Sequence, residues 1–187
     1  MADKVKYGVR KVHYAVLTET EQSGSPVYTY ATPVSIPGAV SLSFDAAGDD
    51  SPFYADDMVY FRAAANNGYT GTMEVAYFPD AFYKDVFGET LDATDKVLTE
   101  SKGVQAKHCA LLFEEEGDAD GTKFLFYEVI FSRPNRSLST TNESITPQTQ
   151  TVSFSAIPRS DSKIKVITTP DTPSGTLSAW YSSVWEA

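Results

Sequence analysis

Residues 124–131 read Phe124-Leu125-Phe126-Tyr127-Glu128-Val129-Ile130-Phe131. Aromatic and β-branched residues favour strands, and a run that is apolar at nearly every position predicts a strand buried on both faces. We therefore expect Thr122–Phe131 to lie either at the centre of a sheet or against a neighbouring subunit. Eleven Tyr, eleven Phe and two Trp make up 13% of the chain, which extends the same preference for strands to the whole sequence.

Other segments on both sides of this run are extended in character, and several of them carry apolar residues at alternate positions. They are Val9–Leu17, Val27–Ile36, Ala39–Phe44, Met58–Ala64, Thr70–Phe78, Val104–Phe113, Thr149–Ile157 and Lys163–Thr169. Asn66-Asn67-Gly68 favours a tight turn with positive φ, so we expect residues 58–64 and 70–78 to pair as a hairpin. Roughly eight strands at short spacing predict a mainly β protein, either a β-sandwich or a partly closed barrel.

One segment changes from strand to helical spacing. Pro79 suits the first turn of a helix, Phe82 and Val86 lie on one helical face, and Gly88 is the residue type that commonly ends a helix. We expect one short α-helix over residues 79–88 that packs on the sheet, because so short a helix is not stable alone.

The remaining segments predict a single domain over residues 1–187 with an extended N-terminal arm at 1–10 and a C-terminal arm at 170–187. Asp45–Asp57 contains five Asp residues around Phe53 and Tyr54, which predicts a long acidic loop. Aromatic side chains in such a loop either dock on a partner or fold back on the core of their own chain.

Charge excludes several kinds of partner. The chain has 25 acidic and 15 basic residues, for a net charge of −10, which opposes binding to phosphate backbones and to anionic lipid surfaces. No run approaches the ~18 apolar residues of a membrane helix, and the first residues carry no apolar signal segment. We expect a soluble protein that is made in a cytoplasm and has no membrane partner.

The sequence offers few groups for catalysis. His13 and His108 lie inside apolar strands, where we expect them to be buried and hydrogen-bonded, and Cys109 points to the opposite face from His108. The acidic turn at 114–121 lacks the ligand order of an EF-hand. We expect no enzyme activity, no cofactor and no metal. Glu74 and Glu128, each inside an aromatic strand, are interpreted as solvated carboxylates, with a glycosidase pair or a water-filled pore as the alternatives.

Several segments follow one another in an order that resembles a known protein family. These segments are Tyr7–Gly8, Val12–Ala15, Pro33–Ser43, Phe53–Asp57, Ala65–Gly71, Pro79–Asp92, Ala110–Glu114, Ser132–Pro134 and Pro147–Thr151. In number and order they closely resemble the major tail protein, or tail tube protein, of long non-contractile-tailed bacteriophages and prophages of Gram-positive hosts. The resemblance covers nearly the whole chain and departs from the family at the Asp-rich segment 45–57.

This resemblance implies a tail-tube β-sandwich whose copies close into hexameric rings. Stacked rings form a hollow tube in the virion, through which the genome passes into the host without specific binding. It also implies a tape measure protein and a tail terminator as partners, and synthesis in the host bacterial cytoplasm. Negative charge along the wall is expected to keep duplex DNA from adhering.

Two sets of residues are assigned to that role. The expected contacts between subunits are Phe53, Tyr54, Asp56, Asp57, Tyr127, Trp180 and Trp185, and the expected lumen-facing acids are Glu74 and Glu128. The alternative from another class is a carbohydrate-binding β-sandwich that uses Tyr28, Tyr30 and Tyr54 as a flat platform.

Overall fold

The computed structural model of the chain describes residues 7–186 except 23, 49, 118–120 and 141–146, and describes only the backbone of 50–53 and 62–64. Strands account for 46% of the chain, and two short helices accompany them. The expected mainly β class is confirmed. The strands form one large antiparallel sheet and two small hairpins, and the large sheet does not close into a barrel in the part of the chain described.

The large sheet contains seven strands in a continuous order, β2-β1-β10-β11-β13-β7-β4, and every pair is antiparallel. Their bounds are β1 Val9–Gln22, β2 Ser25–Tyr30, β4 Ala39–Ala46, β7 Tyr69–Val75, β10 Cys109–Glu115, β11 Lys123–Phe131 and β13 Gln150–Ala156. Three short strands lie off this order: β3 Val34–Ser35 pairs with β1, β12 Asn135–Arg136 with β13, and β14 Lys165–Ile167 with β11. The expectation that Thr122–Phe131 is a central strand is confirmed, because β11 pairs with β10, β13 and β14.

The sheet bends back over itself, so that β4 at one end lies over β10 and β11. The ring of Phe44 on β4 contacts Phe113, Phe124 and Phe126, with ring centroids 5.3–6.3 Å apart. Between these two layers lies the main apolar core, to which β1, β7, β10, β11 and β13 all contribute buried side chains. Many of the aromatic residues that favoured strands in the sequence lie in this core.

Helix α1, Asp80–Phe87, packs against this core and confirms the expected helix at 79–88. Pro79 precedes it in extended backbone, and Gly88 ends it with a φ of 65°, a conformation that glycine adopts without steric cost. The ring of Phe82 packs against Tyr14 and Phe131. The buried face of the helix therefore supplies the packing that so short a helix needs.

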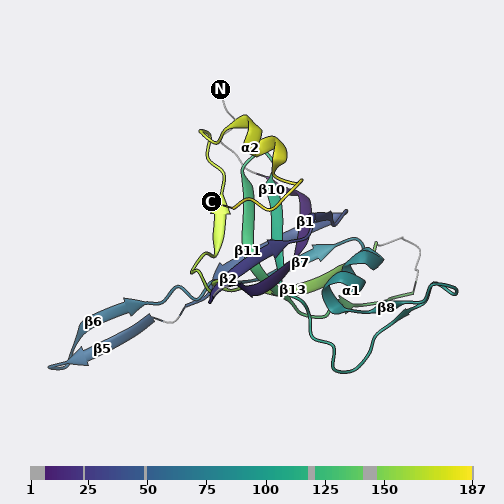
Figure 1. The fold of residues 1–187 in the computed structure, drawn as a ribbon. Coiled ribbons are helices and arrows are strands. Elements are labelled where there is room, and N and C mark those ends of the chain that lie inside the picture. Colours follow the sequence, from purple (N-terminus) through teal and green to yellow (C-terminus); the bar gives the residue numbers. More distant parts are fainter. Residues whose placement is uncertain (1–6, 23, 49, 118–120, 141–146, 187) are drawn as a thin grey trace.

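The C-terminal segment, residues 170–186, is not a free arm. A second helix, α2 (Ser174–Ala179), and the residues after it cover the outer face of β1, β10 and β11 (Figure 1). Trp180 is 2% exposed and packs against Leu112, Leu125 and Tyr127. The C-terminal segment packs here because the central strands are apolar on both faces, so their second face must also be covered. At the other end, β1 already begins at Val9, and residues 1–6 of the expected arm lie outside the described residues.

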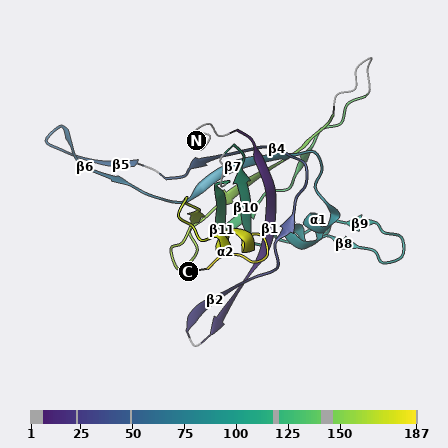
Figure 2. The same cartoon turned by 90° about the horizontal axis from the view of Figure 1, so that it is seen from above.

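The expectation of a long acidic loop at 45–57 is also wrong, because most of these residues lie in strands. β4 continues to Ala46, and β5 (Asp50–Ala55) pairs with β6 (Met58–Ala64). Asp56 and Asp57, with φ of 53° and 61°, form the two-residue turn between them, since Asp tolerates this left-handed conformation better than most residues do. We call residues 50–64 the projecting hairpin, because it extends away from the rest of the molecule (Figures 1 and 2).

This pairing overturns the expected hairpin around Asn66-Asn67-Gly68. β6 pairs with β5, whereas β7 pairs with β4 and β13. The tripeptide instead returns the chain from the projecting hairpin to the sheet, where Gly68 has a φ of 100° and passes close to the backbone of Ala156. A second small hairpin, β8 (Thr90–Leu91) with β9 (Leu98–Thr99), lies on the opposite side of the molecule from the projecting hairpin (Figure 2).

Candidate interaction surface

The projecting hairpin exposes a series of apolar side chains to solvent. The exposed fractions of Tyr54, Met58, Val59, Tyr60 and Phe61 run from 51% for Val59 to 77% for Tyr60. An isolated two-stranded hairpin is marginally stable in water, and contiguous exposed apolar surface marks an interaction site. This hairpin therefore has the properties of a segment that is completed by a partner.

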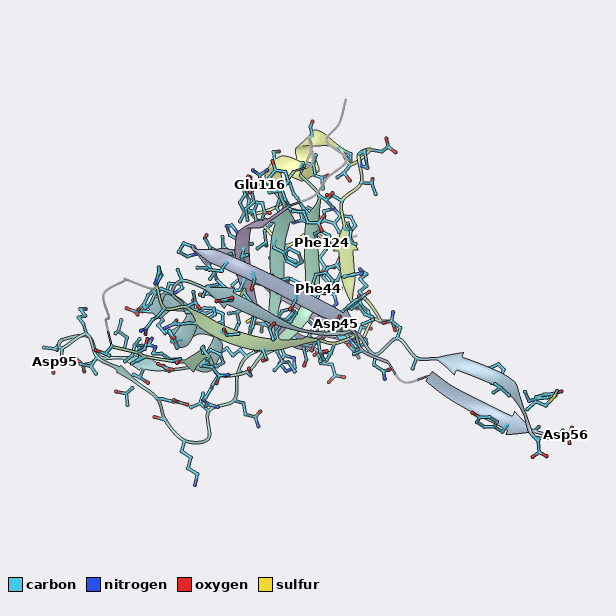
Figure 3. All side chains as sticks on the ribbon, turned by 180° about the vertical axis from the view of Figure 1, so that it is seen from behind. Phe44, Asp45, Asp56, Asp95, Glu116 and Phe124 are labelled. Carbon is cyan, nitrogen blue, oxygen red and sulfur yellow. The ribbon has the colours of Figure 1, made fainter. Side chains whose placement is uncertain are left out.

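Its local geometry follows from the sequence of its turn. The two-residue turn at Asp56 and Asp57 places Ala55 opposite Met58, and the register then shifts by one residue toward the body. Such a bulge increases the local twist of the two strands and disturbs flat edge-to-edge pairing. Figure 3 shows Asp56 at the far tip, well away from the labelled core residues Phe44 and Phe124.

The predicted contact residues divide into two groups. Tyr54, Asp56 and Asp57 lie exposed on the projecting hairpin, and the side chain of Phe53 lies outside the described residues. The other three lie beneath or within the C-terminal segment: Tyr127 and Trp180 are 1% and 2% exposed, and Trp185 is half-buried. In a single copy, Tyr127 and Trp180 are therefore core residues, and Trp185 retains partial access.

Arg159 fixes the end of the C-terminal segment, and the sequence carried no signal that identified it. It is 3% exposed, and its guanidinium donates hydrogen bonds to Asp161, Glu186 and the hydroxyl of Tyr30. The guanidinium also lies 4.0 Å from the ring centroid of Tyr28. The hydrogen bond from Arg159 lowers the pKa of Asp161 to about 2. Tyr28 and Tyr30 are engaged in this cluster, so they do not form the free platform that the carbohydrate-binding alternative needs.

A second charged cluster holds the opposite part of the same segment. Glu114 is 1% exposed and accepts hydrogen bonds from Arg10, Lys11, Lys123 and the hydroxyl of Tyr181. Burial alone would raise its pKa, but the neighbouring cations outweigh burial and lower it. The register shift in β1 lets two consecutive basic residues reach one carboxylate. Through Tyr181, this cluster ties the C-terminal segment to β1, β10 and β11.

The outer face of β4, β7 and β13 is lined with small hydroxyl side chains. Ser43, Thr72 and Ser153 form one cross-strand row, and the hydroxyls of Ser43 and Thr72 lie 2.9 Å apart. Glu74 lies on the same face, half-buried, and accepts hydrogen bonds from Ser41 and Thr149. A shallow trough runs over these strands, and no lysine or arginine is among the described residues that line it.

Glu128 has a different environment from Glu74. It is 7% exposed, and its carboxylate lies 2.6 Å from Nδ1 of His108. The two glutamates share no hydrogen-bonding partner among the described residues, so nothing in the geometry joins them as a catalytic pair. The expectation that Glu128 lies open to solvent is wrong, and so is the expectation that His108 is buried, since its side chain is 44% exposed.

His13 is half-buried rather than buried, but its Nδ1 lies 2.8 Å from the carbonyl oxygen of Lys11, in agreement with the expected hydrogen bond. Cys109 is buried, and burial raises the pKa of its thiol to about 12, so it remains a packed thiol at neutral pH. The described residues contain no cluster of three or more His, Cys, Asp or Glu side chains placed to hold a metal ion.

Comparisons with known proteins add no assignment. No family model matches the chain, and no curated protein matches it. Neither of the two helices in the described part of the chain has the length and apolar character to cross a membrane.

Proposed function

We propose that this protein is a structural subunit that polymerises as stacked hexameric rings into the tail tube of a bacteriophage. The observation that carries the proposal is the projecting hairpin, which exposes apolar side chains from Tyr54 to Phe61 beyond a well-packed body. The order of segments that resembles the tail tube family supports the same role. The protein is then a virion component rather than an enzyme, with the tape measure protein and the tail terminator as its other partners.

A hairpin that leaves one side of a subunit favours head-to-tail assembly. The donor surface and its acceptor lie on different parts of the same chain, so each copy bonds to a next copy and leaves a donor free for further growth. Such heterologous contacts close into rings or continue as filaments, and a stacked tube uses both kinds. The outer edges of β2 and β4, which end the large sheet, offer further backbone groups for pairing between copies.

The hydroxyl-lined face of β4, β7 and β13 is the proposed wall of the conduit. Ser43, Thr72 and Ser153 present neither cations that attract phosphate nor large rings on which bases stack. Asp45 and Glu74 add negative charge to the same face, which repels a passing duplex. We propose that Glu74 faces the lumen of the tube. Glu128 is not part of this wall, because its carboxylate lies against His108.

Electron microscopy of concentrated protein tests the proposal. We expect the wild-type chain to form rings or tubes, and the Tyr60→Ser/Phe61→Ser variant to remain a folded monomer, because it removes apolar surface only from the projecting hairpin. Val97→Ser/Leu138→Ser is the matched control, since it also removes two exposed apolar side chains but lies elsewhere, and we expect it to assemble.

Two results would contradict the proposal. One is a wild-type protein that stays monomeric at millimolar concentration. The other is a hairpin variant that assembles as well as the wild type. Binding of glycans by a stable monomer would favour the carbohydrate-binding alternative instead.

A further inference from the structure

We infer that the tip of the projecting hairpin docks into a basic, aromatic pocket beside β14 of the next copy of this chain. The inference rests on the proposed function and deepens it, because it names the acceptor surface for the hairpin. It identifies Asp56 and Asp57 as the docking groups and Lys163 and Lys165 as their counterparts.

The pocket lies where β14 meets the loop that follows the projecting hairpin. Its volume is about 380 Å³, and its lining includes Asn66, Tyr69, Tyr127, Lys163, Lys165 and Trp185. Lys163 and Lys165 are the charged side chains among the described residues that line it, on a chain whose net charge is −10. An acidic segment is the chemistry that complements such a surface.

The two lysines differ in how far their charge is already neutralised. Nζ of Lys163 lies 3.6 Å from Asp161 and 3.5 Å from Glu186, so it belongs partly to the Arg159 cluster. Nζ of Lys165 lies 4.2 Å from the ring centroid of Tyr69, and no described carboxylate lies within ion-pair distance of it. Lys165 is therefore the cation that remains available to an incoming carboxylate.

Tyr127 adds a second, independent feature of the pocket. Its side chain is 1% exposed, and its hydroxyl is buried with no hydrogen-bond partner among the described residues. A buried polar group without a partner is costly, so docking that opens this side of the pocket would let a carboxylate or backbone group of the hairpin satisfy the hydroxyl. Trp185, half-buried in the same lining, offers an apolar surface to the side chains that flank the hairpin turn.

The hairpin tip has the complementary properties. Asp56 and Asp57 are adjacent and exposed, and neither forms an ion pair within the described part of the chain. Their positive φ values form the tight turn that presents both residues at the end of the two strands. Tyr54 and Met58, 63% and 65% exposed, flank the turn and supply the apolar part of the contact.

A hairpin cannot satisfy the pocket of its own chain. Asn66, in the pocket lining, follows β6 by only two residues, so the pocket lies at the root of the hairpin. Strands of this length, at about 3.3 Å per residue, place the tip on the order of 20 Å from that root. The contact must therefore join different copies, each donating a tip to one neighbour and accepting a tip from another.

A charge-reversal cycle tests the pairing. We expect Lys165→Glu and Asp57→Lys each to raise the protein concentration needed for assembly at least about tenfold, because each places like charges together. The combined variant restores an opposite pair and should assemble at within about threefold of the wild-type concentration. Lys102→Glu, which makes the same change of charge on an exposed loop outside the pocket, should assemble as the wild type does.

The outcomes separate this inference from the proposed function. If the wild type assembles while Lys165→Glu assembles equally well, or the combined variant fails to recover, the pocket assignment is wrong and the tube proposal stands. If the wild type forms no assemblies at all, both fail. Circular dichroism checks that each variant is folded, and Lys165→Gln replaces Lys165→Glu if the latter is not, with a smaller loss of assembly expected.

Discussion

The body of this molecule and its projecting hairpin are both rich in aromatic residues, yet they use them in opposite ways. In the body, rings pack on one another: Phe113 and Phe124 stack with centroids 4.9 Å apart, and Phe78 and Phe82 stack at 4.7 Å. On the hairpin, Tyr60 is 77% exposed. The difference shows that aromatic content alone does not define a core, since the same residue types stabilise one region and leave the other in need of a partner.

The body and the projecting hairpin differ in how many packed layers cover their strands. β11 is covered by the folded-over strands on one face and by the C-terminal segment on the other. β5 and β6 pair only with each other in the described part of the chain, and their described side chains Tyr54, Met58, Val59, Tyr60 and Phe61 are exposed. A strand pair gains stability from burial of its faces, and a hairpin with no cover can gain it only from another molecule.

The largest expected effect separates the two regions directly. Phe126→Ala removes a fully buried ring from the core between the layers and should lower the free energy of unfolding by about 3–5 kcal/mol. Phe61→Ala on the projecting hairpin should change it by less than about 0.5 kcal/mol in dilute, unassembled protein. Chemical denaturation of both variants measures the difference. Equal losses would show that the hairpin is part of the cooperative fold of a single copy.

A smaller effect is expected from the cluster that holds the C-terminal segment. Arg159→Ala removes hydrogen bonds to Asp161, Glu186 and Tyr30 and should cost about 1–3 kcal/mol. The carboxylates are partly exposed and recover hydration, which keeps the loss below that of a fully buried pair. Fluorescence of Trp180 and Trp185 should shift to longer wavelength as the segment loosens. Lys163→Ala, with weaker contacts to the same carboxylates, should cost less than about 1 kcal/mol and leave the emission unchanged.

The smallest expected effect is a loss of stability at acidic pH. The pKa of Asp161 is about 2 in the folded chain, below its ordinary value of about 3.9, so this carboxylate stabilises the fold above pH 4. That contribution is lost as pH falls from about 4 toward 2, and after solvent screening we expect it to be below about 1 kcal/mol. Asp161→Asn should flatten the dependence of unfolding free energy on pH in this window. A slope identical to that of the wild type would exclude the ion pair as a source of acid sensitivity.

Some elements could be predicted because their signals are local. Pro79 and Gly88 bracket α1, and the apolar run from Phe124 to Phe131 identifies a doubly buried strand without reference to its neighbours. Dihedral preference and side-chain spacing act within a few residues, so such elements can be recognised in the sequence.

Other features depended on residues that meet only in the fold. The mainly β class, α1 and the central strand could be read from local patterns of residues. Long-range packing makes residues 58–64 pair with the preceding strand, 50–55, rather than with the following one, 70–78, because β7 pairs with β4 and β13 in the large sheet. It also decided that Trp180 is covered and that Arg159 holds Glu186. Strand partners and buried charges depend on contacts between residues far apart in the chain, so no single short segment of sequence contains the information that selects them.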